Sequence, residues 1–273
     1  MVTAMVDAGA RSRLAASGLW DLHWFGSLDS TNAWALAQAR QGAPAGLVAV
    51  ADHQVAGRGR LGRAWQAPPG SSLLMSVLLR PDLDAEHLHL TTAVVAMAAA
   101  DACRSEAGVD PGLKWPNDLL LAERKLAGVL AEADVEGGRV RAVVVGLGLN
   151  LGWPPGPQEG SGEADANELG ALGGIALGEV AGVEVDRARL LAALLDSLGG
   201  RCRALEEPRG RLSQASEYRQ RCVTVGRHVR AQLADDSVTG LAVDVTAEGH
   251  LLVDVGARLK RITAGDVVHV RPA

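Results

Sequence analysis

The sequence predicts an α+β fold, in which a mixed and largely antiparallel sheet is flanked by helices and followed by a small C-terminal β-barrel. Three observations support this fold class. Apolar runs joined by short turns occupy residues 113–150, as in an antiparallel meander. Stretches rich in alanine and leucine with helical spacing lie at 88–107 and 186–198. Short valine-rich segments follow one another closely after residue 221, which is typical of a small barrel.

The chain length allows either one large core or a large and a small domain, because 273 residues exceed what a small single core requires. The change from helical spacing to short strands places a boundary near Arg221. We therefore expect a lead-in over residues 1–20, a large domain over 21–221 and the barrel over 222–273.

Composition excludes several classes of protein. With 48% hydrophobic and 22% charged residues, the chain resembles ordinary folded proteins rather than disordered ones. A net charge of −5 argues against a general nucleic-acid-binding surface. Cys103, Cys202 and Cys222 are odd in number and far apart, so they predict neither a disulfide framework nor a zinc site. The chain shows neither a leader nor an apolar run of membrane-spanning length, so a reducing cytoplasm is expected.

The first half of the large domain is predicted to place a long loop between two buried strands. Residues 23–25 form a short strand, and the four polar side chains at 29–32 precede a helix. Apolar strands at 46–51 and 72–79 flank a loop over 53–71, which is longer than a simple connection requires.

The later elements follow from the same patterns. In the meander, strands are expected over 113–121, 126–133 and 140–150, with a turn at 122–125. Helices are expected at 88–107, from an N-cap at Asp186, and at 213–221 after a break at Pro208 and Gly210. The proline-containing stretch 153–162 is expected to be a surface loop. The expected barrel strands are 223–225, 229–231, 239–245, 251–255 and 267–270.

The stretch from Gln54 to Trp65 carries the clearest chemical signal. Three glycines alternate with three arginines over residues 57–63, so backbone N–H groups and guanidinium groups can surround a phosphate or carboxylate together. The glycine spacing also matches a dinucleotide-binding fingerprint, but the two prolines at 68–69 prevent the helix that this motif needs. The remaining alternative is a mobile, solvated basic loop.

Lysine usage provides a second signal. Only Lys114, Lys125 and Lys260 are lysines among 27 basic residues, and the first two lie within twelve positions of each other. Lysine is a compact point charge and arginine a planar fork, so a position that keeps lysine in this chain indicates chemistry that arginine cannot replace. Nearby, Gly128, Gly146 and Gly148 either clear one sheet face for a flat ligand or mark a tight sheet crossing.

Five motifs follow one another in order along the chain. They are Asp29-Ser30-Thr31-Asn32, the stretch Gln54 to Trp65, Lys114-Trp115-Pro116-Asn117-Asp118, Arg124-Lys125-Leu126-Ala127-Gly128 and Gly146-Leu147-Gly148-Leu149-Asn150. Together they resemble the biotin protein ligases over residues 20–152, and the terminal barrel looks like the SH3-like domain of that family. The resemblance implies a fold of the class II synthetase and biotin ligase type.

The resemblance implies two half-reactions. The carboxylate of biotin attacks the α-phosphate of ATP to give biotinyl-5′-AMP and pyrophosphate, with Mg²⁺ held mainly by ATP rather than by the protein. A lysine of a biotin carboxyl carrier protein then attacks the mixed anhydride. Because two anions must meet in the first step, the site has to supply fixed cations and hydrogen-bond donors.

The resemblance also implies roles for individual residues. Lys125 would contact both the biotin carboxylate and the α-phosphate, while Arg58, Gly59 and Arg60 fold over the adenylate, with Arg60 counted as catalytic. Asp118 would orient or deprotonate the incoming lysine. Gly128 and Gly148 would let the flat biotin bicycle lie against the sheet. The polar edges of the ureido ring would be bound by Ser30, Thr31, Asn32 and Gln54. The nucleotide would be bound by Arg63, Trp65 through stacking on adenine, Lys114, Asn117 and Asn150.

Two rival functions stay open at this point. A ligase for lipoate or another fatty acid could use the same scaffold, although the polar set at 30–32 and Gln54 favours a ring with hydrogen-bonding edges. The second rival is a non-enzymatic binding module. Lys125 argues against it, because arginine would be sufficient for binding alone. Repressor-type members carry a DNA-binding domain ahead of the Ser-Thr-Asn segment, where this sequence has about thirty residues, so we expect no operator binding. We also expect no membrane partner, a monomer or weak dimer, and a C-terminal barrel that assists carrier docking or interdomain closure.

Overall fold

The computed structural model describes residues 19–137, 139–152, 174–233, 236–256 and 258–270. The expected surface loop at 153–162 and nearly all of the lead-in lie outside these residues. In the described part of the chain, no helix combines the length and the apolar character needed to cross a membrane.

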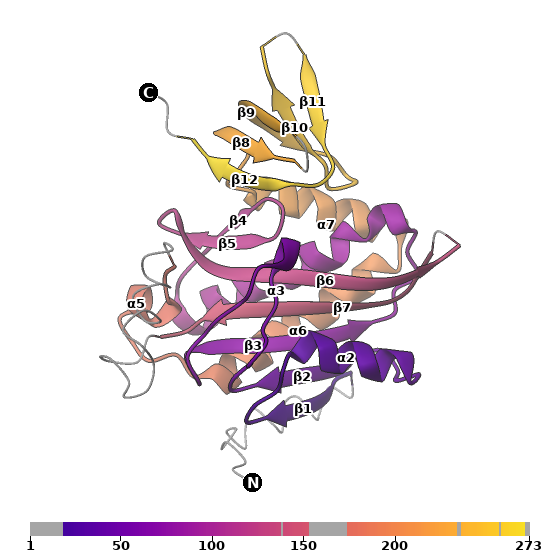
Figure 1. Cartoon of the computed structure of the whole chain (residues 1–273), viewed down its shortest axis with the longest axis vertical. Helices are drawn as coiled ribbons and strands as arrows, with labels where there is room; N and C mark the ends of the chain where they lie inside the picture. The colour runs from indigo at the N-terminus through magenta and orange to yellow at the C-terminus, as the bar shows by residue number, and fades with distance from the viewer. Residues whose placement is uncertain (1–18, 138, 153–173, 234–235, 257, 271–273) are drawn as a thin grey trace.

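A seven-stranded sheet forms the centre of the large domain (Figure 1). Only β1 and β2 pair in parallel, and the other neighbours are antiparallel, so the predicted mixed and largely antiparallel sheet is confirmed. In spatial order the strands are β1 (Asp21–Phe25), β2 (Leu47–Ala51), β3 (Ser72–Leu79), β7 (Arg139–Asn150), β6 (Arg124–Glu136), β5 (Asp118–Leu121) and β4 (Gly112–Lys114).

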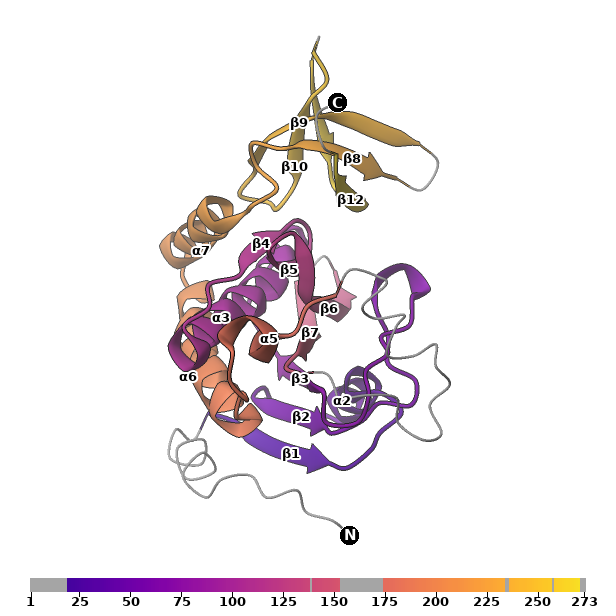
Figure 2. The same ribbon diagram turned by 90° about the vertical axis from the view of Figure 1, so that its left-hand side faces the viewer.

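Helices cover both faces of this sheet. Helices α3 (His89–Ala107) and α6 (Arg187–Leu205) pack together on one face, whereas α2 (Thr31–Arg40) lies on the other, as Figure 2 shows. Helix α3 is buried along most of its length, and eight of its twelve buried residues are alanine or valine, which are small enough to pack closely. The predicted helices at 88–107 and from Asp186 are confirmed, and the Asp186 side chain accepts the N–H of Ala188 at 2.8 Å.

The helix expected at 213–221 begins earlier than predicted. Helix α7 spans Pro208–Arg221, so the expected break at Pro208 and Gly210 was wrong. Proline is compatible with the first helical turn because the N–H that it lacks has no partner there. Gly210 lies against Ala204 at the end of α6, where a Cβ would come within 1.9 Å of the Ala204 carbonyl oxygen. The glycine thus permits a close helix–helix corner. The short helix α5 (Leu177–Ala181) precedes α6.

The predicted antiparallel meander is confirmed for β5, β6 and β7. The strand expected over 113–121 is instead split into β4 and β5 by a turn at 115–117. The turn expected over 122–125 is shorter, because Ala122 and Glu123 alone have left-handed φ angles, of 46° and 65°. Lys125 is therefore placed on a strand, with a fixed backbone on both sides.

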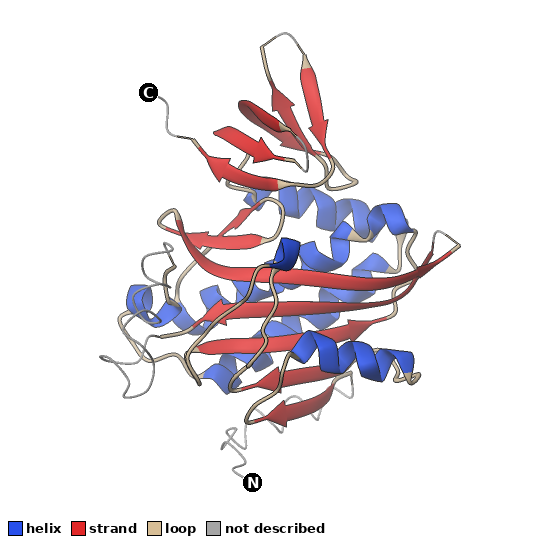
Figure 3. Cartoon of the chain, viewed as in Figure 1, coloured by secondary structure: helices blue, strands red, loops and turns tan. Residues whose placement is uncertain are grey.

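The C-terminal unit is a five-stranded antiparallel sheet above the large domain (Figure 3). Among the described residues, its edge strands β11 and β12 do not pair, so the sheet is open where a closed barrel was expected. The strand expected at 223–225 is a turn. In spatial order the strands are β11 (Leu259–Ile262), β10 (Leu251–Asp254), β9 (Ser237–Val245), β8 (His228–Gln232) and β12 (Asp266–His269).

The turn between β9 and β10 joins the two sheets. The indole Nε1 of Trp115 donates to the Gly249 carbonyl at 2.8 Å, and Gly249 lies directly against the His89 ring at the start of α3. Burial of His89 lowers its pKa from 6.5 to about 4. This contact therefore forms around a neutral imidazole at pH 7.

Candidate active site

The open face of the large sheet carries a pocket beside the beginning of α2. The loop 54–65 lines one side, strands β6 and β7 form the floor, and Asp266 of β12 reaches it from the C-terminal sheet. The structure brings fourteen of the predicted site residues into this one pocket. They are Ser30, Thr31, Asn32, Gln54, Arg58, Gly59, Arg60, Arg63, Trp65, Asn117, Asp118, Lys125, Gly128 and Gly148.

The arginine-rich loop is folded back on itself. The Gly59 N–H donates to the Arg63 carbonyl at 2.7 Å, and the Trp65 N–H donates to the Gly57 carbonyl at 2.9 Å. Leu61 stands at its tip with a left-handed φ of 56°, an uncommon conformation for a residue with a side chain. Trp65 and Arg58 of this narrow hairpin contact the large sheet, whereas Arg60 and Arg63 reach toward the C-terminal unit.

The Trp65 ring covers the glycines of the floor. A Cβ at Gly148 would lie 2.4 Å from Trp65 Cε2, and one at Gly128 would lie 3.2 Å from Trp65 Cζ3. We expected these glycines to clear space for a flat ligand and Trp65 to stack on a base elsewhere. In this structure the cleared space instead holds the indole, which also lies 5.5 Å from Lys125 Nζ, as in a cation–π pair.

Lys125 and Asp118 form an ion pair with 2.7 Å between Nζ and Oδ1. The two side chains come from neighbouring strands, β6 and β5. Lys125 keeps 40% of its side chain exposed, whereas Asp118 keeps 17%, so the ammonium group is held by the carboxylate and still faces the pocket. A flexible ammonium group beside a fixed carboxylate suits a site that neutralises the charge of a bound anion and transfers a group.

The C-terminal sheet contributes the partners of two loop arginines. Arg60 donates from NH1 to the Asn117 side chain at 3.1 Å and to the Gly265 carbonyl at 3.3 Å. Asp266 lies 3.8 Å from Arg60 and also pairs with Arg63. Sequence reasoning missed Asp266, because the contact spans about 200 positions and a single aspartate in a strand carries no local signal.

Two predicted residues lie outside this pocket. Asn150 is buried, and its Nδ2 donates to the Ile175 carbonyl at 3.2 Å, so its side chain is used in packing. Lys114 lines an adjoining cavity between β4 and the C-terminal sheet, which shares Asn117, Asp118 and Asp266 with the main pocket. Burial of Lys114, helped by the charge of Lys125, lowers its pKa below the usual value of lysine.

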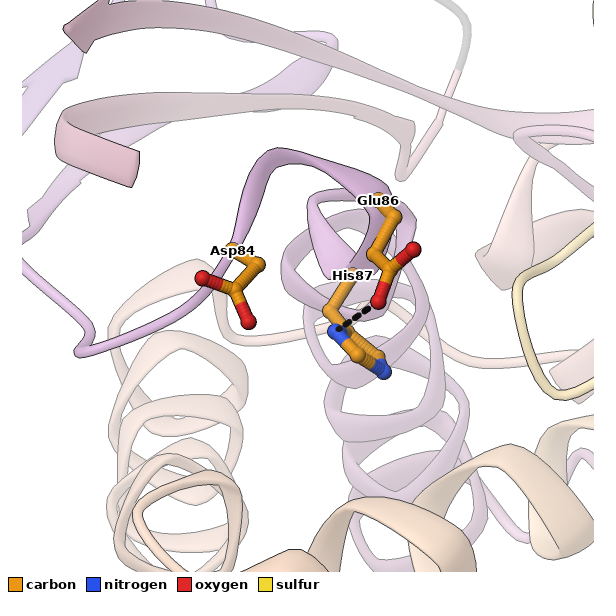
Figure 4. Close-up of side chains that lie close together, drawn as sticks. All are labelled: Asp84, Glu86 and His87. Atoms are coloured by element: carbon orange, nitrogen blue, oxygen red, sulfur yellow. Dashed lines mark ion pairs between the residues drawn. The ribbon is translucent and has the colours of Figure 1, made fainter. Parts of the chain in front are cut away.

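Another polar group stands apart from the pocket. Asp84, Glu86 and His87 surround the short turn η2 (Ala85–His87), and their ligand atoms lie within 4.8 Å of one another, as Figure 4 shows. Asp84 and Glu86 are exposed, Asp84 also lies 3.7 Å from Arg139, and none of the three lines the pocket. Exposed acidic side chains gather in this way without any ion, so we assign no metal to them.

Comparisons with known proteins agree with the motifs. The family model described as "Biotin/lipoate A/B protein ligase family" matches residues 24–150, and the one described as "Biotin protein ligase C terminal domain" matches residues 224–270. A biotin–[acetyl-CoA-carboxylase] ligase of Mycobacterium tuberculosis is 37% identical over 94% of this chain and 92% of its own length. One from Paracoccus denitrificans is 32% identical over 88% of this chain and 96% of its own.

Solved structures show the same likeness. A biotin protein ligase from Aquifex aeolicus, in complex with biotin and ATP, matches with a TM-score of 0.72 and 25% identity, covering 92% of this chain and 99% of that one. Sequence motifs, fold and comparisons therefore agree, and the chain belongs to the biotin protein ligase family, a family of ligase-class enzymes.

Proposed function

We propose that this chain activates biotin with ATP and then transfers the biotinyl group to a lysine of a biotin carboxyl carrier protein. The observation that carries the proposal is the single pocket in which Lys125, three loop arginines and the polar start of α2 converge. One end of this pocket offers fixed hydrogen-bonding groups, and the other offers cations. A small molecule with a polar ring and a carboxylate tail fits this division.

In the first half-reaction, a carboxylate oxygen of biotin attacks the α-phosphorus of ATP. A bond forms between them, the bond from the α-phosphorus to the bridging oxygen breaks, and pyrophosphate leaves. Lys125 would lie between the two anions, where its charge offsets their repulsion. Arg58, Arg60 and Arg63 would bind the phosphates from the loop side, and Mg²⁺ would arrive with ATP. Reaching phosphate requires Arg60 and Arg63 to share or exchange their contacts with Asp266.

In the second half-reaction, the carrier amine attacks the carbonyl carbon of the anhydride. A C–N bond forms, AMP leaves, and the amine loses a proton. Asp118 would orient the amine or accept this proton once Lys125 has turned to the phosphate, and its ion pair with Lys125 supports this role. The wall that Trp65 makes over Gly128 and Gly148 would bind the apolar part of biotin rather than the adenine base.

The remaining expectations stay predictions. These are a cytoplasmic enzyme, a monomer or weak dimer, no nucleic-acid partner, and a boundary near Arg221 between the ligase domain and the C-terminal unit. The contacts of Asp266 with the loop support the role of the C-terminal sheet in interdomain closure.

Pyrophosphate release with a ligand panel tests the proposal. The purified protein is given ATP and Mg²⁺ with biotin, lipoate or octanoate, or no acid. We expect release with biotin only, and label transfer when a carboxyl carrier domain is added. Release with lipoate only would favour the rival ligase, and none with any acid would favour a binding module.

A further inference from the structure

A continuous series of hydrogen bonds runs beneath the polar end of the pocket. It begins at Gln54, passes through Thr31, Ser76 and Asn32, and ends at Glu132. Gln54, Thr31 and Asn32 line the pocket, whereas Ser76 and Glu132 do not. We call these five side chains the relay. Ser76 is fully buried, and it was missed although a serine in the apolar strand 72–79 was a visible signal.

The sheet register builds the relay. Ser76, Gly146 and Leu130 are direct partners across β3, β7 and β6. The Asn32 amide lies over Gly146, where a Cβ would come within 2.2 Å of Asn32 Oδ1. The glycine thus leaves the amide room to lie between Ser76 on one side and strand β6 on the other.

The two ends of the relay determine its donor and acceptor directions. The Thr31 backbone N–H can only donate, and it does so to Gln54 Oε1 at 2.7 Å. The Gln54 Nε2 group is therefore left as the donor. At the other end, the Glu132 carboxylate and the Leu130 carbonyl can only accept. They lie 2.9 and 3.3 Å from Asn32 Nδ2, which leaves Asn32 Oδ1 to face Ser76.

The middle of the relay follows from these ends. The Ser76 Oγ lies 2.6 Å from Asn32 Oδ1 and 2.7 Å from Thr31 Oγ1, but Ser76 has one hydroxyl proton. Asn32 Oδ1 has no proton to give, so the Ser76 proton goes to Asn32. The Thr31 hydroxyl has two oxygens of the protein within reach, Ser76 Oγ at 2.7 Å and Gln54 Oε1 at 3.0 Å. Its single proton goes to one of these two, so Thr31 Oγ1 offers a bound ligand its lone pairs.

We propose that Glu132 is a positioning residue for recognition of the ureido ring, because it holds the Asn32 amide, and through Ser76 the Thr31 hydroxyl, without lining the pocket. The pocket then presents Gln54 Nε2 as donor, because the Thr31 backbone N–H occupies Gln54 Oε1, and Thr31 Oγ1 as acceptor. A ureido edge needs both, since its carbonyl accepts and its N–H groups donate. This inference rests on the proposed function, because it concerns recognition of biotin in the same pocket.

Glu132 has a second partner that offers a competing explanation. Arg58 donates from NH2 to Glu132 Oε2 at 3.1 Å, so the carboxylate could act by holding the loop instead of the relay. The two explanations differ in which residue Glu132 should couple to. A relay effect requires energetic coupling to Ser76, and a loop effect requires coupling to Arg58.

Biotin affinity measured by calorimetry without ATP, on the full chain, separates these cases. Glu132→Gln replaces an obligate acceptor with an amide that can turn either way, so we expect about tenfold weaker biotin binding. Ser76→Ala should weaken binding by a similar factor. The double variant should be little weaker than either single one, because both break the same relay. Affinity for an ATP analogue should change less than twofold in each.

Controls keep the test decisive. Glu136→Gln removes a carboxylate from the same strand that pairs only with the exposed Arg141 among its described contacts, and it should bind biotin normally. If Ser76→Ala fails to fold, Ser76→Cys replaces it, because the slightly larger thiol fills the site and is only a weak hydrogen-bond donor. Two results would overturn the inference. One is that the losses of biotin affinity in Glu132→Gln and Ser76→Ala add in the double variant. The other is that Glu132→Gln couples energetically to Arg58→Met instead of to Ser76→Ala. Absence of biotin binding by the unaltered chain would instead refute the proposed function.

Discussion

Two groups of arginines and carboxylates in this molecule differ in how completely they pair. In the first, which we call the helix cluster, Asp101, Arg201, Glu217 and Arg221 join α3, α6 and α7. Arg201 is 12% exposed, and its NH2 lies 2.6 Å from Asp101 and 2.7 Å from Glu217. In the pocket, by contrast, Arg58, Arg63 and Lys125 keep 48%, 71% and 40% of their side chains exposed.

The difference separates structural charge from functional charge. The helix cluster pairs its charges within the fold, so removing one member leaves partly buried charges with fewer partners. Arg58, Arg63 and Lys125 have one carboxylate partner each among the described residues and stay largely exposed, whereas Arg60, at 24% exposure, is held by several groups. A group of charged side chains therefore does not by itself identify the active site. Cations that can still bind a further anion do.

The largest effect is expected at the pocket. Lys125→Arg keeps the charge but replaces a point cation with a wider fork, so adenylate formation should fall by about 10²–10³. Thermal stability should stay near that of the unaltered chain. Lys260→Arg, a substitution on β11 outside the pocket, is the matched control. Single-turnover formation of biotinyl adenylate measures both, and near-normal activity of Lys125→Arg would remove Lys125 from the mechanism.

The opposite pattern is expected in the helix cluster. Arg201→Met should lower the free energy of unfolding by about 2 kcal/mol, because Asp101 and Glu217 then keep only Arg221 as a shared charged partner. Activity per folded molecule should be unchanged. Urea unfolding with an adenylation assay checks both. A loss of turnover without a loss of stability would contradict the distinction between the helix cluster and the pocket cations.

Acid should act on the helix cluster through its carboxylates. Burial raises the pKa of Asp101, but hydrogen bonds from Arg201, Arg221 and Ser197 outweigh it and bring the value below the usual one. Arg201 likewise lowers the pKa of Glu217. Because folding lowers both values, this stabilisation is complete above the unfolded values near 4 and is lost as pH falls through the folded ones. Urea midpoints should therefore fall more steeply below about pH 4 in the unaltered chain than in Asp101→Asn/Glu217→Gln. Parallel curves would contradict this prediction.

The smallest effects are expected in the loop. Ordering of residues 54–65 over the adenylate should slow amide exchange there several-fold when biotin and ATP are added. Arg60→Gly removes the contacts with Asn117 and Asp266 and should release adenylate faster. Hydrogen exchange and adenylate leakage report on these steps. Equal protection with and without ligands would show that the hairpin is already fixed.

Short sequence patterns predicted much of this molecule. They could not predict contacts between segments that are distant in the sequence. Capping side chains and glycine–arginine alternation are local, so the start of α2 and the loop could be placed from sequence. The seat of Trp65 on Gly148 depends on how the loop folds back over the sheet, which no spacing reveals. Asp266 and the link from Asp101 to the other members of the helix cluster were missed for the same reason, since those contacts span 100 positions or more.

The central claim is that one pocket joins biotin to AMP before any carrier arrives. Exchange of labelled pyrophosphate into ATP tests it most directly, because exchange requires reversible formation of an enzyme-bound adenylate. We predict exchange that depends on biotin, needs no carrier protein, and falls by about 10²–10³ in Lys125→Arg. Exchange that requires the carrier, or that proceeds equally well without biotin, would contradict the account.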